Sequence, residues 1–141
     1  MKTTLIACLF AVAGFLTNAA AAQESQTFHT PSKNVYCYAD VTDAVTTVDC
    51  ELLSKNSNKP LRPVPSDCEQ DWGNRFALND SGKAFMVCAG DTLRSNSAAN
   101  FPYGRQFDYY GITCTSSEQG LECINNDGHG FKISKSKQEM Y

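Results

Sequence analysis

Cysteine content constrains this chain more than any other feature of its sequence. Seven cysteines occur in 141 residues, and six of them fall between residues 37 and 123. An even number of widely spaced cysteines in a small domain is typical of a disulfide framework formed in an oxidising compartment. We therefore expect three disulfides, formed among Cys37, Cys50, Cys68, Cys88, Cys114 and Cys123.

Strand phase narrows the choice among the possible pairings. All of these cysteines except Cys68 share sequence parity with nearby apolar residues, as Cys50 does with Val48, so their side chains would lie on the apolar face of a strand. Pairing in sequence order joins neighbouring strands and closes the smallest loops. We predict the bridges Cys37–Cys50, Cys68–Cys88 and Cys114–Cys123. A cysteine zinc site is disfavoured because the chain has no Cys-x-x-Cys spacing.

Residues 1–22 have the composition of a secretory signal peptide. Lys2 precedes an apolar run over residues 5–16, and the small residues at 18–22 would form the cleavage region. The apolar run is too short to span a bilayer comfortably. We expect cleavage after Ala22 and an exported protein, periplasmic or extracellular, with no membrane span in the mature chain.

A lipoprotein-processing box is the alternative at this end of the chain. Residues 5–8 read Leu-Ile-Ala-Cys, and such a box would anchor the protein through Cys8. Most of the apolar run follows Cys8 instead of preceding it, which favours ordinary signal cleavage. The remaining residues, 23–141, have the length of a single disulfide-rich domain.

The mature chain is mildly acidic. The sequence has 12 basic and 15 acidic residues, and loss of Lys2 with the signal peptide changes the formal net charge from -3 to -4. Nucleic-acid binding normally requires clustered lysine and arginine, so we expect no nucleic-acid partner. The one basic cluster, Lys132, Lys135 and Lys137, is interpreted as a solvated tail rather than a site for an anionic partner.

Short strands separated by turn signals predict an all-β fold, a small antiparallel β-sandwich or barrel-like domain stabilised by disulfides. We expect a last strand at 131–134 and three hairpins, from 34–40 with 45–53, from 75–78 with 84–89, and from 111–115 with 120–125. Prolines at 60, 63 and 65 exclude their segment from a central ladder. The capping-box pattern that begins at Ser66 predicts at most one short helical turn, ending at Gly73.

An aromatic-rich stretch at residues 101–110 supplies candidate binding residues. Four of its rings share sequence parity and would pack into the core as a row, namely Phe101, Tyr103, Phe107 and Tyr109. The alternative is partial exposure, in which rings of this stretch join Arg105 and Trp72 in a platform for stacking on a sugar or gripping a protein. Trp72, Tyr103 and Arg105 are therefore candidate binding residues.

One of only two histidines, His129, lies between glycines at 128 and 130. A turn between strands is the preferred interpretation, with glycine supplying positive φ, and His129 is a further candidate for contact with a ligand. No metal and no cofactor are predicted, because the partial calcium-loop pattern around Asp127 lacks its first and last ligands. Residues 80–82, Asp-Ser-Gly, are interpreted as a hairpin turn and not as the surroundings of a nucleophile.

These features support two functional hypotheses. The preferred one is a non-enzymatic binding or inhibitor module acting on a protein or an envelope glycan, because the domain is small, densely bridged and rich in aromatic residues. The alternative is a small secreted hydrolase with His129 as general base, near Asp91, Asp127 or a serine. Binding is favoured because histidine is so scarce, and no catalytic residue is assigned.

Seven short motifs also occur in order along the mature chain. They read FHTPSKNVYC, DWG, CAGDT, PYG, GITCTS, GLECIN and GHGF, and they begin at residues 28, 71, 88, 102, 111, 120 and 128. The ordered set resembles a family of small exported bacterial proteins classed only as a domain of unknown function. The resemblance implies an exported, disulfide-bonded domain, and it brings no activity, cofactor or catalytic residue.

Overall fold

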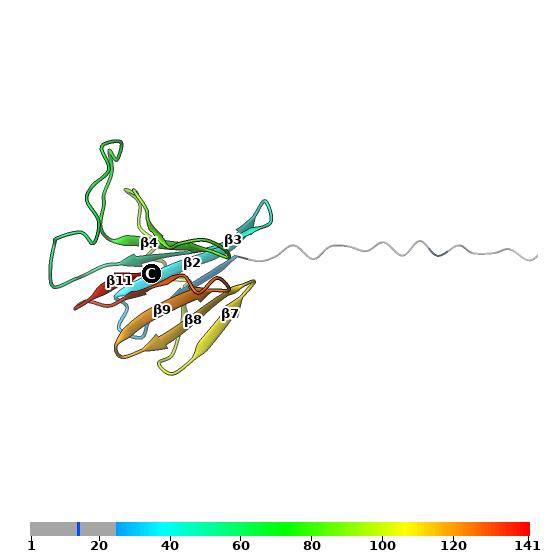
Figure 1. Cartoon of the computed structure of the whole chain (residues 1–141). Coiled ribbons are helices and arrows are strands. Elements are labelled where there is room, and N and C mark those ends of the chain that lie inside the picture. Colours follow the sequence, from blue (N-terminus) through cyan, green and yellow to red (C-terminus); the bar gives the residue numbers. More distant parts are fainter. Residues whose placement is uncertain (1–13, 15–24) are drawn as a thin grey trace, which may run out of the picture.

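The computed structural model describes Gly14 and residues 25–141. Apart from Gly14, the expected signal peptide lies outside the described residues, together with its cleavage site and Cys8. The described chain forms two β-sheets that pack face to face, and this part of the chain contains no helix (Figure 1). Of the two predicted architectures, the protein adopts the sandwich, because neither sheet closes into a barrel.

In residues 25–141, eleven strands make up the two sheets. Sheet A has the order β5 (Phe85–Met86), β4 (Arg75–Asn79), β3 (Val45–Leu52), β2 (Val35–Thr42), β1 (Gln26–His29) and β6 (Ala99–Asn100). Sheet B has the order β11 (Gln138–Met140), β10 (Gly130–Ile133), β9 (Gly120–Asn125), β8 (Ile112–Ser117) and β7 (Gln106–Tyr109). Within the described residues, β1 and β6 pair in parallel and the other neighbours are antiparallel.

Alternation along the strands places one face of each sheet in the core. On β3 the fully buried apolar positions are Val48, Cys50 and Leu52, with partly exposed residues between them. Side chains of this kind from the two inner faces interdigitate between the sheets. Phe76 of sheet A and Phe131 of sheet B are both fully buried, and their ring centroids lie 6.2 Å apart.

The disulfides pair the cysteines in sequence order, as predicted. The bridges are Cys37–Cys50, Cys68–Cys88 and Cys114–Cys123. The first and third join residues directly opposite each other on neighbouring strands, and all four of those cysteines are at most 1% exposed. The second joins two loops at the surface, where Cys88 is exposed, so the predicted position of Cys88 on the apolar face of a strand is wrong, because β5 ends at Met86. Two bridges are therefore part of the core and one is accessible to solvent.

The three predicted hairpins are present as β2–β3, β4–β5 and β8–β9, and the predicted last strand is β10. The sequence allowed at most one short helical turn, and none forms in residues 66–73. Residues 66–73 contain a hydrogen-bonded turn, in which Cys68 N–H donates to Pro65 O at 3.1 Å, and no helix. A helical nucleus fixes several residues for one hydrogen bond, and this segment is tied elsewhere, since Gly90 N–H donates to Gln70 Oε1 at 2.7 Å beside the disulfide.

The aromatic stretch divides between core and surface. Phe101 and Tyr109 are buried, and Phe107 packs against the core with its ring stacked 5.6 Å from that of Tyr109. Tyr103 leaves this row and is 42% exposed. The chain turns at Gly104, where φ is +81°, a conformation that glycine adopts without strain. The predicted core row therefore holds for three rings and fails at Tyr103.

Candidate ligand-binding site

Five connecting segments meet at one end of the sandwich and enclose a pocket of about 380 Å³. They follow β1, β3, β6, β8 and β10. A volume of this order lies within the range of small-molecule sites. Hydroxyl, amide and charged side chains form most of the lining, together with the buried Val35 and Ile133 and the exposed ring of Tyr103. We call this cavity the Tyr103 pocket.

Several polar groups of the lining are hydrogen-bonded and fix the shape of the walls. The Asn34 amide pairs with the backbone of Ser54, donating from Nδ2 to Ser54 O and accepting at Oδ1 from Ser54 N, both at 2.9 Å. Ser117 Oγ bonds within the β8–β9 turn at 3.3 Å, and Ser134 Oγ bonds within the β10–β11 turn at 3.1 Å. The walls are thus ordered by contacts within the protein.

Four other lining groups make no hydrogen bond or ion pair within the described part of the chain. They are the Ser54 hydroxyl, the Tyr103 hydroxyl, the Glu118 carboxylate and the Lys135 ammonium. The carboxylate only accepts hydrogen bonds, the ammonium only donates them, and the hydroxyls do both. A ligand with closely spaced donors and acceptors and one flat apolar side would match this set.

A second pocket of about 400 Å³, which we call the lysine pocket, adjoins the first at the edge of sheet B. Glu118 and Ser134 line both cavities, and Lys132 and Lys137 line the second. Lys137 Nζ lies 2.7 Å from Glu139 Oε1, and this hydrogen bond lowers the pKa of the Glu139 carboxyl. The predicted solvated tail is wrong, because the chain continues into β11, which pairs with β10.

Trp72 and Arg105 do not line either of these pockets. Trp72 packs against the core, and its indole N–H donates to Arg62 O at 2.9 Å, which fastens the proline-rich loop to the sandwich. Arg105 is exposed in the same turn as Tyr103, and its backbone N–H donates to Pro102 O at 3.2 Å. Trp72 makes no ring contact with Tyr103 within residues 25–141, so the two rings do not form one platform.

His129 lies at the opposite end of sheet B, in the turn between β9 and β10. β9 runs from Gly120 beside the Tyr103 pocket to Asn125 beside this turn, a rise of roughly 17 Å at about 3.4 Å per residue. Among the residues described, no hydrogen bond or ion pair joins the imidazole to a carboxylate or a hydroxyl. His129 and Tyr103 therefore cannot contact the same small ligand.

The Asn125 side chain fixes the β9–β10 turn through its hydrogen bonds. Its side chain is buried and donates from Nδ2 to Asn79 O at 3.0 Å and to Gly82 O at 2.7 Å, both in the β4–β5 turn of sheet A. Its Oδ1 accepts from the backbone N–H groups of Asp127 and His129, both at 3.1 Å. Gly82 N–H also donates to Asp127 Oδ2 at 2.8 Å. The turn is therefore a polar contact that holds the two sheets together.

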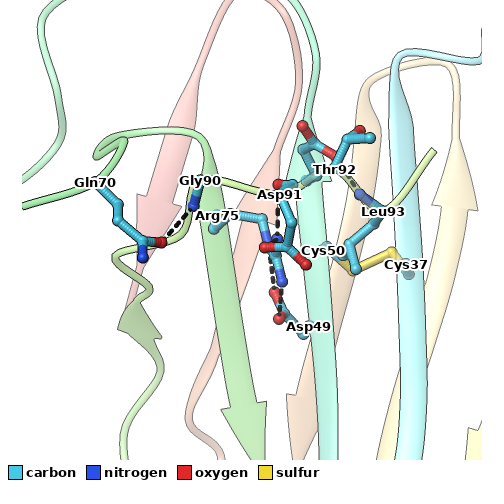
Figure 2. A network of polar contacts seen from close by, with 10 residues as sticks. Cys37, Asp49, Cys50, Gln70, Arg75, Gly90, Asp91, Thr92 and Leu93 are labelled. Atoms are coloured by element: carbon cyan, nitrogen blue, oxygen red, sulfur yellow. Dashed lines mark hydrogen bonds and ion pairs between the residues drawn. A yellow bond between two sulfur atoms is a disulfide. The ribbon is translucent and has the colours of Figure 1, made fainter.

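A second polar network holds residues 90–93 against the outer face of sheet A, as Figure 2 shows. The buried Arg75 donates from Nε to Asp49 at 3.0 Å, forms an ion pair with the same carboxylate through Nη2, and reaches Asp91 Oδ1 at 3.4 Å. The hydrogen bond to Asp49 raises the pKa of Arg75. Glu51 accepts from Leu93 N–H at 2.6 Å. Asp91 thus contacts Arg75, the first residue of β4, whereas the β9–β10 turn contacts Asn79, the last residue of the same strand.

Residues 14 and 25–141 include no group of three or more histidine, cysteine, aspartate or glutamate side chains arranged to hold a metal ion. A helix of the length and apolar character needed to cross a membrane is likewise not found over this range. The three disulfides indicate that the protein matures in an oxidising environment.

The match to a sequence family agrees with this disulfide-bonded sandwich. The model of a family of unknown function, DUF6636, matches residues 5–141. The chain belongs to this family. The DUF6636 match confirms the resemblance drawn from the ordered motifs, and it assigns no activity. No curated protein and no solved structure matches the chain.

Sequence reasoning on this DUF6636 protein named Tyr103 as a binding candidate while preferring a core position for its ring, and it did not single out Ser54 or Glu118, which line the same pocket. Both missed residues are ordinary surface types in turns, and they are far apart in the sequence. The predicted hairpins could have indicated a shared site, because antiparallel strands bring every second connection to the same end of a sheet. Polar residues in alternate connections are therefore candidates for one shared site.

Proposed function

We propose that this protein is an exported, non-enzymatic binding module that holds a glycan in the Tyr103 pocket. The observation that carries the proposal is the set of four unengaged groups in a pocket whose walls are already hydrogen-bonded. A preformed site loses little conformational entropy when it binds a ligand. The pocket therefore favours recognition of a small polar unit.

The chemistry of the four groups suits a sugar. Neighbouring sugar hydroxyls can donate to the Glu118 carboxylate and accept from the Lys135 ammonium, and Ser54 Oγ can take either role. The exposed ring of Tyr103 offers a flat surface for the C–H face of a pyranose. An aromatic ring with a few placed polar groups is the usual composition of a ligand pocket.

The pocket lining supports binding over hydrolysis. Glycoside hydrolysis in most enzyme families requires two carboxyl groups across the scissile bond. Among the described residues that line the Tyr103 pocket, Glu118 supplies one carboxylate and no histidine is present, and Glu139 in the adjoining lysine pocket is held in an ion pair with Lys137. Export through the N-terminal signal peptide would bring such a module to the periplasm or the extracellular space, where its disulfides form and envelope glycans are accessible.

Binding of soluble oligosaccharides to the oxidised protein tests the proposal. Tyr103→Ala removes the ring and is expected to weaken binding by about five- to thirtyfold, the usual range for an aromatic residue at the centre of a site. Tyr110→Asn is the matched control. Tyr110 is 55% exposed in the β7–β8 turn at the far end of the sandwich, where its φ of 41° is a conformation that asparagine tolerates.

Titration calorimetry with neutral and acidic oligosaccharides would give the affinities, and circular dichroism would show that both variants fold. An equal loss of affinity in both variants would contradict the proposal, as would unchanged affinity in Tyr103→Ala. Glu118→Gln keeps the shape of the side chain and removes its charge, so it is expected to weaken ligand binding without abolishing it.

A further inference from the structure

The Tyr103 pocket and the lysine pocket adjoin each other, and we call the two together the groove. Glu118 and Ser134 line both cavities, so the two spaces meet along the β8–β9 and β10–β11 turns. The Tyr103 pocket has a volume of about 380 Å³ and the lysine pocket has one of about 400 Å³. A ligand that fills the first pocket can therefore continue into the second, which a single sugar unit cannot do.

The charged side chains that line the groove have one more positive than negative charge, in a protein that is acidic overall. Its charged lining consists of three lysines and two glutamates, namely Lys132, Lys135, Lys137, Glu118 and Glu139. The Lys137–Glu139 ion pair neutralises one charge of each sign. Within the described residues, neither Lys132 nor Lys135 forms an ion pair, although Lys132 lies opposite Glu122 and Glu139 in the strand ladders and its charge helps to lower the pKa of the Glu139 carboxyl. The whole chain has a formal net charge of -3, so the charge of the groove lining is opposite in sign to that of the protein as a whole.

The two lysines come from β10 and from the turn that follows it. Lys132 lies on β10, on the face of sheet B that points away from the core, because its neighbours Phe131 and Ile133 are fully buried. Lys135 follows the end of the same strand and lines the Tyr103 pocket. Positive charge is thus present in both halves of the groove, where it would attract a ligand with repeated negative charge.

We infer that the ligand is an acidic polysaccharide segment, with one sugar unit beside Lys135 in the Tyr103 pocket and an anionic group of a neighbouring unit beside Lys132 in the lysine pocket. This inference rests on the proposed function and adds its ligand class. Glu118, at the junction, accepts from sugar hydroxyls and disfavours an anionic group at that position. The arrangement therefore selects a chain whose carboxylates are separated by hydroxyl-bearing sugar rings, instead of a dense polyanion.

Affinity electrophoresis of the oxidised protein in gels containing polygalacturonate, dextran or dextran sulfate tests the inference. Polygalacturonate supplies a carboxylate on each sugar, dextran is neutral, and dextran sulfate is a dense polyanion. We expect retardation by polygalacturonate that weakens as salt is added, because exposed charge contacts are screened. Lys132→Gln and Lys135→Gln should each reduce affinity for polygalacturonate by about two- to fivefold.

Lys83→Gln is the matched control. It makes the same change in net charge in the β4–β5 turn at the opposite end of the sandwich, and it should leave the affinity unchanged. Equal retardation by dextran, independent of salt and of both groove lysines, would overturn the inference and leave the proposed function standing. Stronger retention by dextran sulfate, weakened equally by Lys83→Gln, would show non-specific attraction and also overturn it. If no polysaccharide binds and Tyr103→Ala changes nothing, the proposed function fails as well.

Discussion

Replacement of Asn125 by alanine should destabilise the protein more than any other single polar change in the β9–β10 turn. The side chain is 5% exposed and makes four hydrogen bonds, two of them to carbonyl groups of the other sheet. Each such bond contributes about 1 kcal/mol net, and unpaired groups that water can reach recover part of the loss. We expect Asn125→Ala to reduce the free energy of unfolding by about 3 kcal/mol.

Urea denaturation followed by circular dichroism measures this loss, and a thermal scan should show a midpoint lower by roughly 10 °C for a domain of this size. Asn126→Ala is the control, since Asn126 is the exposed neighbour and its removal should change stability by less than about 0.5 kcal/mol. A loss below about 1 kcal/mol for Asn125→Ala, or an equal loss for the control, would refute the assignment of this side chain as an inter-sheet contact.

Asn125→Asp separates hydrogen bonding from packing at the same position. A carboxylate can accept from the N–H groups of Asp127 and His129, but it sets a second negative oxygen against the carbonyls of Asn79 and Gly82. This environment would raise the folded-state pKa of the new carboxyl above its unfolded value. Relative to Asn125→Ala, the variant should therefore gain stability as the pH falls through that pKa, and a flat difference between the two would contradict the reasoning.

Two further predictions concern the turns and the bridges. Ala44 has a φ of 64° in the β2–β3 turn, so Ala44→Gly should raise the free energy of unfolding by about 1 kcal/mol, and an unchanged or lower urea midpoint would count against this. Under limiting reductant, the exposed Cys68–Cys88 bridge should open first, with the sandwich retained. Loss of all three, at about 3 kcal/mol each, should then unfold the domain, which thiol mapping by mass spectrometry and circular dichroism would follow together.

The hairpins could be predicted because their evidence is local. In β3, β8 and β9 the buried and exposed positions alternate in the sequence itself, and the connections contain turn-forming residues. Two of the disulfides followed from the same alternation, because their cysteines share the phase of apolar neighbours and occupy opposite positions in a ladder, as Cys37 and Cys50 do. A hairpin whose alternating residues and turn residues all lie in one short segment can be predicted without knowledge of the rest of the fold.

The other strands depend on partners that the local sequence does not specify. β6 is two exposed residues, Ala99–Asn100, and it is a strand because β1 lies beside it in parallel. β11 has one apolar residue, Met140, and is held by its ladder with β10. The lysines near the C-terminus resemble a solvated tail in sequence, and only that ladder brings them to the edge of a groove.

The candidate site was visible in the sequence only at Tyr103, and even there the predicted orientation was inward. Parity along residues 101–109 assumes a continuous strand, whereas the turn at Gly104 reverses the direction of Tyr103. Ser54, Glu118 and Lys135 meet because three separate connections reach the same end of the sandwich. Such convergence is a property of topology, and each residue alone is an unremarkable surface side chain.

The order of the disulfides has a consequence for how the protein is made. The paired cysteines are separated by 13, 20 and 9 residues, and each pair is complete before the next begins. A chain that enters an oxidising compartment N-terminus first therefore presents each cysteine with its correct partner before a competing one arrives. Uncatalysed reshuffling of wrong bridges takes minutes to hours, and oxidation in the order of emergence avoids that step. Maturation should consequently require a thiol oxidant and proceed at full yield without a disulfide isomerase.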